Sequence, residues 1–305
     1  MVHFGNINLH RAKKIKDDEF YTQISDIENE LIHYKQHFKD KVVLCNCDNP
    51  VHSAFWKYFH LNFAELGLKK LIATYYNGRK ASYKTEYIGG NDEDINIGVK
   101  TQLKGNGDFR NQECLELLNK CDIVCTNPPF SLFRSYIGVL MKHNKKFLII
   151  GNKNAVTYKD FFQLLKDNKV WTGCTNVKDF LQPNGDIKKF GNIGWFTNLK
   201  TFNQHQKLAL QKIYIPELYP RFDNIPSVIN INKIKDIPVN YNGWMAVPIT
   251  ILDKDVSQFE IVDLLNRYAV LDYFGVNKDV KSRHSHCCNI KGIPTYCRVV
   301  IRKIQ

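Results

Sequence analysis

The sequence of 305 residues lacks any apolar run that approaches the ~18 residues of a membrane-spanning helix. Its N-terminal residues also lack the continuous apolar stretch of a secretory signal. No internal repeat and no low-complexity tract is evident. These absences predict a cytoplasmic protein, and 44% hydrophobic residues supply enough core for one large domain or two modest ones.

The sequence also lacks the even set of cysteines that a disulfide framework requires. Its nine cysteines are an odd number spread over a long chain, which favours reduced thiols. The segment at residues 283–288 brings together His284, His286, Cys287 and Cys288, but their spacing matches no structural zinc pattern. We therefore expect neither disulfides nor a metal site.

Acidic residues are scarce relative to basic ones, with 30 Asp and Glu against 43 Lys and Arg, for a net charge of +13. Such a surplus favours a polyanionic partner, because neutralising phosphates releases condensed counterions. Residues 200–305 hold 15 basic and 9 acidic residues, so positive charge is densest there. Charge alone leaves open both a nucleic-acid partner and a basic protein without one.

Strands and helices are predicted to alternate through the first two thirds of the chain. Apolar residues at helical spacing predict an amphipathic helix from Ile24 to Phe38, and an N-cap serine, Ser53, opens a second helix at residues 53–66. Residues 77–98 are rich in Gly and Asn and predict a surface excursion. The strands are predicted at residues 41–47, 69–76, 99–103, 122–126, 146–151 and 170–175. This order predicts an α/β fold with a doubly wound, mostly parallel sheet.

The pattern changes twice towards the C-terminus. Residues 180–200 contain an Asn-Gly turn and a second strand, which predicts an antiparallel hairpin at the edge of the sheet. Beyond residue 200 the segments are short and prolines are scattered. We therefore predict one domain at residues 1–200 and a smaller one at residues 201–305.

The sequence Asn127-Pro128-Pro129-Phe130 follows a predicted strand, at the sheet edge where α/β proteins bind their ligands. The Asn127 side chain and the Pro128 backbone each offer a carbonyl oxygen, and two such acceptors favour the pyramidal, nucleophilic form of an aromatic amine. Consecutive prolines keep these acceptors in place, and Phe130 offers a flat face for a planar base. The motif predicts a pocket for an aromatic amine, with an ordinary turn at the end of a strand as the alternative.

This motif resembles the catalytic motif of amino-methyltransferases that use S-adenosylmethionine. Further segments resemble the EcoRI-type modification methylases, which methylate adenine in DNA. In order along the chain they are residues 18–23, 26–31, 41–50, 66–73, 107–110, 122–134, 145–159, 195–199 and 235–250. The resemblance implies a Rossmann-like methyltransferase fold, S-adenosylmethionine as cofactor, and double-stranded DNA as partner. It also implies the gamma-class order of segments, in which target recognition lies last, at residues 201–305.

The resemblance further implies cofactor contacts before the catalytic motif. Tyr21 and Thr22 are expected to close over the methionine part of the cofactor, although the same segment reads as a cap for the following helix. Asp48 and Pro50 stand where most methyltransferases of this fold carry a Gly-rich loop, and Asp48 is expected to meet the amino group of the cofactor. The glycines of that loop are missing here.

Three more residues complete the implied cofactor site. Asp108 is expected to accept a hydrogen bond from the adenine amine of the cofactor while Phe109 packs on its ring. The alternative for Asp108 is an N-cap of the next helix. Asn127 is expected to border the cofactor as well as the target amine.

DNA contacts are expected from two regions. Trp195 and Phe196 are nominated to hold the target base, although either could simply belong to the core. Candidate contacts to phosphates or bases in the C-terminal region are Arg221, Lys233, Lys235, Arg267, Lys278, Lys281 and Arg283. The resemblance also implies a palindromic site with an A/T-rich centre, and we expect a monomer. The sequence leaves open whether a cognate restriction endonuclease exists, and we expect no stable complex with one.

Together these features predict a site-specific DNA adenine N6-methyltransferase that acts on an adenine flipped out of the duplex. One alternative keeps the fold and changes the substrate, as in RNA adenine or protein glutamine methyltransferases. The other alternative is a catalytically inactive DNA-binding module.

Overall fold

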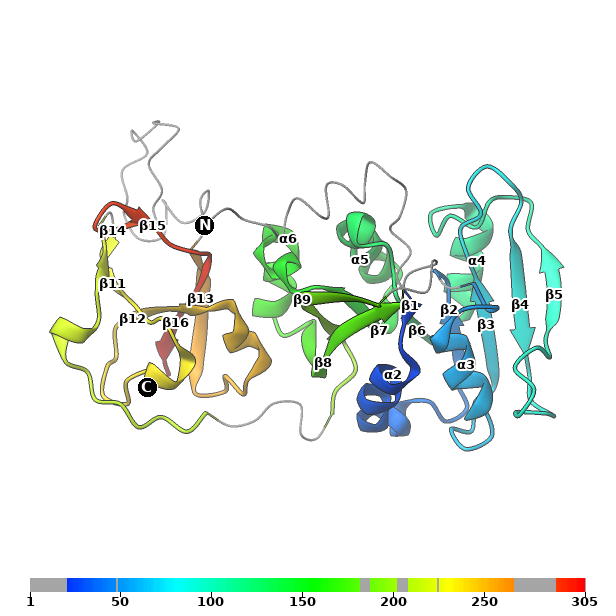
Figure 1. The fold of residues 1–305 in the computed structure, drawn as a ribbon, viewed down its shortest axis with the longest axis horizontal. Helices are drawn as coiled ribbons and strands as arrows, with labels where there is room; N and C mark the ends of the chain where they lie inside the picture. The colour runs from blue at the N-terminus through cyan, green and yellow to red at the C-terminus, as the bar shows by residue number, and fades with distance from the viewer. Residues whose placement is uncertain are drawn as a thin grey trace. The chain divides into compact units, whose positions relative to one another are not determined.

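The computed structural model describes residues 21–47, 49–181, 187–201, 208–223, 225–265 and 289–304. The chain divides into two compact units, which Figure 1 shows with their elements labelled. Unit 1 comprises residues 1–155 and 170–202, and unit 2 comprises residues 156–169 and 203–305. Helix α6 (Lys159–Lys166), which the sequence analysis assigned to the first domain, belongs to unit 2.

Among the described residues, unit 1 is built on a nine-stranded sheet in the order β1-β8-β9-β7-β6-β2-β3-β4-β5. The four central strands, β3, β2, β6 and β7, run parallel, and the strands at both edges are antiparallel. The predicted α/β class with an antiparallel hairpin, β8 and β9, is confirmed. The strands are β1 (Tyr21–Thr22), β2 (Val42–Cys45), β3 (Lys70–Thr74), β4 (Tyr83–Tyr87), β5 (Val99–Gln102), β6 (Ile123–Thr126), β7 (Lys146–Asn152), β8 (Trp171–Leu181) and β9 (Ile187–Thr197).

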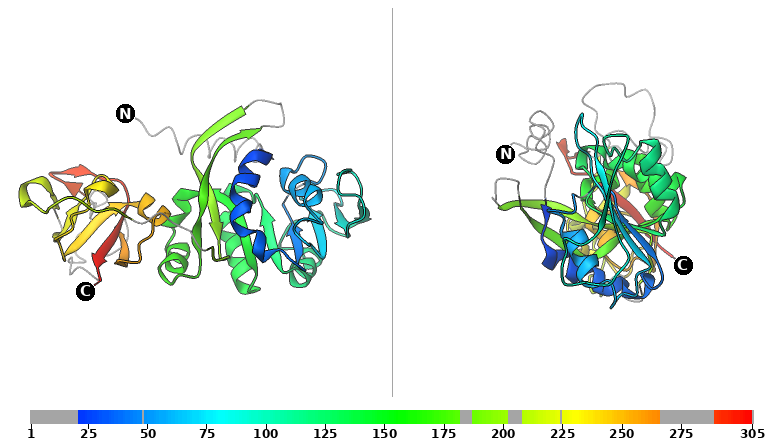
Figure 2. Two further views of the ribbon diagram at one scale, coloured as in Figure 1. Left: turned by 90° about the horizontal axis from the view of Figure 1, so that it is seen from below. Right: turned by 90° about the vertical axis from the view of Figure 1, so that its right-hand side faces the viewer.

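Helices cover both faces of this sheet (Figure 2), because the central strands are apolar on both sides. Val43 and Cys45 of β2 share one core with residues of α2 and α3, while Leu44 points to the other face and is equally buried. The described residues of unit 1 form helices α2 (Ile24–Leu31), α3 (Ala54–Leu61), α4 (Gln112–Lys120) and α5 (Phe133–Lys142). They also form the 3-10 turns η1 (Ile32–His37), η2 (Phe130–Leu132) and η3 (Lys153–Thr157), the last of which continues into unit 2.

The first two predicted helices are present, although their α-helical parts, Ile24–Leu31 and Ala54–Leu61, are shorter than predicted. Leu31, Tyr34 and Phe38 are fully buried, and η1 extends α2 so that the apolar stripe continues. The Ser53 hydroxyl accepts a hydrogen bond from the Trp56 amide at 3.1 Å and caps α3. These features depend on neighbours in sequence, which is why the pattern revealed them.

The predicted surface excursion at residues 77–98 is wrong in part. It contains strand β4, which pairs antiparallel with β3 and β5. The strand predicted at residues 99–103 is β5, which lies at the edge of the same sheet and pairs antiparallel with β4. The sequence pattern did not predict β4 because most of its side chains are polar. One of them, Glu86, forms ion pairs with Lys70 and Lys84, with N–O distances of 2.9 Å and 2.7 Å.

Unit 2 contains a five-stranded sheet in the order β10-β11-β12-β16-β13 and a small hairpin, within the part of the chain that the structure describes. Helix α6 contacts this sheet through Lys166, whose ammonium donates to the Val262 carbonyl at 2.6 Å. The core of the sheet includes Phe222, Val228 and Val300. The elements are η4 (Pro216–Leu218), β10 (Arg221–Phe222), β11 (Ile225–Asn230), η5 (Ile234–Asp236), β12 (Trp244–Pro248), η6 (Ile249–Asp253), β13 (Phe259–Leu265), β14 (Asn289–Ile290), β15 (Ile293–Pro294) and β16 (Arg298–Lys303).

The described part of the chain contains no membrane-spanning helix and no metal-binding cluster of side chains. No helix in that part of the chain is long and apolar enough to cross a membrane. The same residues contain no group of three or more His, Cys, Asp or Glu side chains that could hold a metal ion. The described cysteines are free thiols. His284, His286, Cys287 and Cys288 lie outside the described residues.

Candidate active site

The motif at residues 127–130 begins where β6 ends, at the carboxyl edge of the parallel strands. The Thr126 hydroxyl accepts a hydrogen bond from the Cys47 amide at 3.2 Å, which joins the loops after β6 and β2. Pro128 is buried, whereas Asn127, Pro129 and Phe130 are half-buried. The motif therefore lies at the surface edge of a buried framework, where a ligand has access to it.

Phe130 is held edge-on against the hairpin strand β8. Its ring centroid lies 6.1 Å from that of Phe180, with an angle of 88° between the ring planes. The ring packs against the core of unit 1 but stays partly exposed. This contact fixes the orientation of a ring that still has surface for stacking.

The loop after β2 is fixed by side-chain hydrogen bonds in place of the missing glycines. Asn46 is buried, and its side-chain oxygen accepts a hydrogen bond from the Tyr136 hydroxyl of α5. Its backbone oxygen accepts from the Thr74 hydroxyl at 3.4 Å. Sequence reasoning missed Asn46, although an asparagine inside the apolar run that ends β2 was the available signal. Pro50 lies half-buried in the following turn, and Asp48 lies outside the described residues.

The loop that carries Gly107, Asp108 and Phe109 meets the same tyrosine. The buried Phe109 ring packs edge-on against Tyr136, with the ring centroids 5.0 Å apart. Gly107 has a φ of +79°, and a Cβ there would lie only 1.9 Å from the Tyr75 carbonyl oxygen. Because only glycine fits at this point, the loop passes tightly beneath the end of β3.

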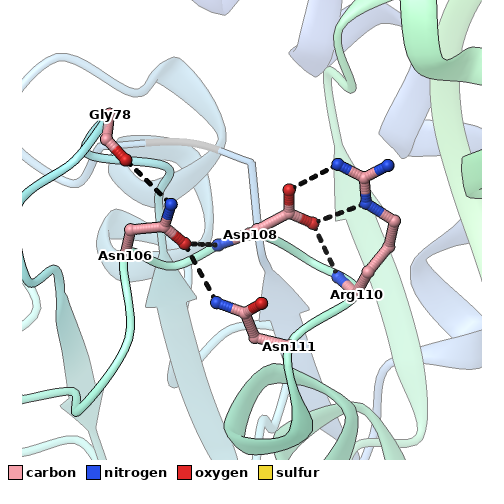
Figure 3. Close-up of polar contacts among 5 residues, drawn as sticks. All are labelled: Gly78, Asn106, Asp108, Arg110 and Asn111. Atoms are coloured by element: carbon pink, nitrogen blue, oxygen red, sulfur yellow. Dashed lines mark hydrogen bonds and ion pairs between the residues drawn. The ribbon is translucent and has the colours of Figure 1, made fainter.

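Asp108 is an ionised carboxylate paired with Arg110 (Figure 3). It accepts hydrogen bonds from the Arg110 amide at 2.9 Å, from Nε at 2.8 Å and from Nη2 at 2.6 Å. The hydrogen bonds from the guanidinium hold the pKa of Asp108 below its ordinary value. The alternative that Asp108 caps a helix is wrong, because α4 begins at Gln112 and its N-cap is Asn111.

Asn106 holds this loop in its shape. Its side-chain oxygen accepts from the Asp108 amide at 3.2 Å and from the Asn111 side chain at 2.9 Å, and its side-chain amide donates to the Gly78 carbonyl at 2.8 Å (Figure 3). The Asp108 backbone is therefore fixed before any ligand binds.

Tyr21 and Thr22 form strand β1, which pairs with β8 in the register Tyr21 with Leu181 and Thr22 with Phe180. Thr22 is buried, and its hydroxyl oxygen has no hydrogen-bond partner among the described residues. Gln23 of the same segment is the N-cap of α2, but its side chain makes no cap hydrogen bond. β1 thus lies beside the strand that supports Phe130.

A family model matches almost the whole chain. It describes the adenine-specific methyltransferase EcoRI and matches residues 8–304. The chain belongs to this family. The site just described therefore lies in an EcoRI-type methylase, as the sequence resemblance implied.

Curated relatives give the same result. The chain is 46% identical to the Type II methyltransferase M.EcoRI of Escherichia coli over 290 residues, which cover 83% of this chain and 88% of the relative. It is 40% identical to M.MgeORF184P of Mycoplasma genitalium over 321 residues, which cover 98% and 99% of the two chains. It is 39% identical to M.MpnI of Mycoplasma pneumoniae over 320 residues, which cover 97% and 98%. No solved structure matches the chain.

These findings confirm the predicted activity. The chain is a site-specific, adenine-specific DNA methyltransferase of Type II. They do not support the alternatives of an RNA or protein methyltransferase or of an inactive DNA-binding module. Methyltransferases in general use S-adenosylmethionine as methyl donor.

Trp195 and Phe196 of this EcoRI-type methylase are both 0% exposed in β9. Trp195 packs edge-on against Phe55, with the ring centroids 5.8 Å apart. The ring centroid of Phe196 lies 5.4 Å from that of Phe133, the first residue of α5. Neither side chain has surface available for a base in this structure. Both pack in the core, which is the alternative that the sequence left open.

The nominated basic residues of unit 2 divide into two groups. Arg221, Lys233 and Lys235 are exposed, and the Arg221 guanidinium donates to the Pro226 carbonyl and, at 3.3 Å, to the Tyr214 hydroxyl. The remaining candidates lie outside the described residues, namely Arg267, Lys278, Lys281 and Arg283. Their contacts with DNA stay predictions.

Tyr136→Phe tests the contacts by which Tyr136 joins the loop at Asn46 to the loop at Phe109. The substitution keeps the ring that packs on Phe109 and removes the hydroxyl that donates to Asn46. Loss of one such hydrogen bond lowers the free energy of unfolding by about 1 kcal/mol. If ligand binding must restore the position of Asn46 at a similar cost, affinity for S-adenosylmethionine falls about fivefold. Isothermal titration calorimetry measures this change. An unchanged affinity would show that the Asn46 contact does not shape the cofactor site.

Proposed function

We propose that this methylase transfers the methyl group of S-adenosylmethionine to the N6 amine of an adenine that leaves the duplex and enters the site at residues 127–130. The observation that carries the proposal is the convergence of three loops at one sheet edge. The Cys47 amide bonds Thr126, and Tyr136 contacts both Asn46 and Phe109. A cofactor and a base bound at this edge would have their reacting atoms close together.

The described residues fit the cofactor in their chemistry. The buried Thr22 hydroxyl lacks a partner in the described residues and suits a polar group of the methionine part. The Asp108 carboxylate suits the adenine amine, with Phe109 beside it, and we assign Tyr21, Asp48 and Pro50 to the remaining contacts. When bound, S-adenosylmethionine supplies an electrophilic methyl group on a positively charged sulfur.

Asn127 and Pro128 hold the target amine. The side-chain carbonyl of Asn127 and the backbone carbonyl of Pro128 each accept one hydrogen from N6, which localises the nitrogen lone pair for attack on the methyl carbon. As the carbon-nitrogen bond forms, the carbon-sulfur bond breaks, and N6 then loses one proton to water. Pro128 and Pro129 have no backbone N–H and keep the turn stiff, so the acceptors need no reorganisation.

Phe130 holds the base plane. An unstacked adenine loses contacts with its neighbours in the duplex, and stacking on an aromatic side chain returns about 1–3 kcal/mol. The edge-on contact with Phe180 fixes the Phe130 ring for this purpose. Trp195 and Phe196 support the site from within the core.

We further propose that unit 2 recognises the DNA and that the enzyme acts as a monomer on a palindromic site with an A/T-rich centre. Exposed cations at Arg221, Lys233 and Lys235 support this assignment, together with the positive surplus of residues 200–305. A cognate restriction endonuclease, if paired with this methylase, would share its site without forming a stable complex.

The experiment that tests the proposed function uses methyl-labelled S-adenosylmethionine with duplex DNA, RNA and protein as substrates. We expect label only in duplex DNA, and digestion to nucleosides should release it as N6-methyladenine. Label on another atom of adenine, or no binding of the donor by calorimetry, would contradict the proposed chemistry.

The affinity for DNA is expected to fall steeply with added salt. Each phosphate contact contributes a slope of about 0.9 in a plot of log affinity against log salt concentration. Lys233→Ala and Lys235→Ala should each lower the slope by about one unit. Fluorescence anisotropy with a duplex measures both effects, and Lys39→Ala in unit 1 is a matched exposed control. A slope that stays the same in both unit 2 variants would remove these lysines from the interface.

A further inference from the structure

Glu30 of α2 is a 0% exposed acid that the reaction described above does not use. Among the described residues, each of its carboxylate oxygens accepts two hydrogen bonds. Oε1 accepts from the Tyr34 hydroxyl at 3.0 Å and the Cys174 amide at 2.8 Å. Oε2 accepts from the Thr175 amide at 2.7 Å and the Thr175 hydroxyl at 2.6 Å. Burial raises the pKa of Glu30, and these hydrogen bonds oppose that shift.

The strand that binds Glu30 is bulged at this point. Thr172 of β8 pairs with Phe196 and Asn176 pairs with Gly194, so residues 173–175 face only Trp195 of β9. A Cβ at Gly173 would lie 2.2 Å from Oε1 of Glu30 and 2.4 Å from Cβ of Trp195. The bulge at residues 173–175, which we call the Glu30 seat, thus packs closely around one carboxylate.

The segment that contains β1 and α2 contacts β8 at a second place. β1 pairs with β8 at Phe180, and α2 begins two residues after β1. The Phe180 ring in turn contacts Phe130 of the catalytic motif. The two attachments to β8 therefore connect the Glu30 seat with β1 and with the support of Phe130.

We propose that Glu30 is a positioning residue for methyl transfer, which locks α2 onto the bulge of β8 and thereby holds β1 over the cofactor. The inference rests on the proposed function, because it takes Tyr21 and Thr22 as cofactor contacts. Glu30 touches neither substrate nor cofactor, and it acts through the placement of β1.

The chemistry of the seat makes Glu30→Gln the sharpest probe. Glutamine has nearly the same shape, but its amide nitrogen would replace one oxygen and would face the backbone amide of Cys174 or Thr175, which can only donate. Because a buried donor cannot satisfy another donor, the substitution opens the seat without leaving a large cavity. Glu28→Gln, at an exposed position on the same helix, is the matched control.

We expect Glu30→Gln to raise the KM for S-adenosylmethionine about tenfold, while kcat at saturating donor falls less than threefold. Hydrogen exchange should show loss of protection at the backbone amides that join β1 to β8. Glu28→Gln should change neither quantity. A folded Glu30→Gln enzyme with wild-type KM and wild-type protection of β1 would overturn the proposal.

Two further variants separate positioning from stability. Phe63→Leu trims a buried ring that packs edge-on against Tyr87 of β4 at 4.9 Å, so it lowers the melting temperature without altering the Glu30 seat. It should leave the KM for the donor unchanged. If Glu30→Gln does not fold, Thr175→Val removes only the hydroxyl bond to Oε2 and should raise the KM less, in the same direction. An unchanged KM in Thr175→Val would then overturn the proposal.

The outcome for the wild-type enzyme distinguishes the two levels of inference. Wild-type protein that binds no S-adenosylmethionine refutes the proposed function itself. Wild-type protein that binds the donor, beside seat variants with unchanged KM and unchanged protection of β1, refutes only the role of Glu30.

Discussion

Asn127→Ala is expected to lower the rate of methyl transfer about 10²- to 10³-fold, the loss typical of removing one fixed polar contact to a reacting group. The substitution removes a side-chain acceptor for the target amine and leaves the Pro128 carbonyl in place. Binding of S-adenosylmethionine and of duplex DNA should stay within about threefold of wild type. Single-turnover transfer of labelled methyl groups measures the rate without product release.

The comparison for Asn127→Ala is Asn96→Ala, an exposed asparagine in a surface turn of the same unit. This control should transfer methyl groups at the wild-type rate. Near-normal turnover by Asn127→Ala would remove the side-chain carbonyl from the mechanism. A parallel loss of DNA binding would instead assign Asn127 to the interface.

Gly107→Ala should have the second large effect. The added methyl group would lie 1.9 Å from the Tyr75 carbonyl oxygen, which is backbone and cannot rotate away as a side chain could. The loop must shift, and Asp108 and Phe109 shift with it. We expect affinity for S-adenosylmethionine to fall at least tenfold, together with a lower melting temperature, as measured by calorimetry and thermal unfolding.

Gly78→Ala isolates the steric part of that effect. Gly78 also has a positive φ of +60°, but no heavy atom lies within 4 Å of the position that its Cβ would take. It should lose only about 1 kcal/mol of stability from the left-handed backbone conformation and keep its affinity for the donor. Equal losses of affinity in the two variants would show that backbone strain, and not the contact with Tyr75, governs the site.

The sequence predicted those parts of the site that depend on short segments. The apolar stripe of α2, the cap at Ser53 and the strand before Asn127 each depend on spacing within a few residues. The resemblance then suggested the roles that we propose for the motif and for the loop at Gly107. For the same reason, the sequence predicted the α/β class of unit 1 and its central parallel strands.

Contacts between distant segments could not be predicted in the same way. Tyr136 and Asn46 are 90 residues apart, and Glu30 and Cys174 are 144 residues apart. No local pattern encodes which polar side chain will meet which buried backbone amide. β4 was missed for a related reason, since a strand with polar side chains along most of its length lacks the apolar alternation that marks a half-buried strand.

The antiparallel ribbon of β4 and β5 has a consequence for the solubility of the enzyme. Without the ribbon, β3 would present its free backbone amides and carbonyls beside the buried apolar side chains of Leu71, Ile72 and Ala73, which is the kind of edge that recruits other chains into aggregates. The ribbon replaces that edge with β5, whose four side chains are all exposed and include Lys100. A lysine at an open strand edge resists pairing with a second copy, because the two cations would meet. The ribbon therefore replaces an apolar strand edge with one that carries a charge.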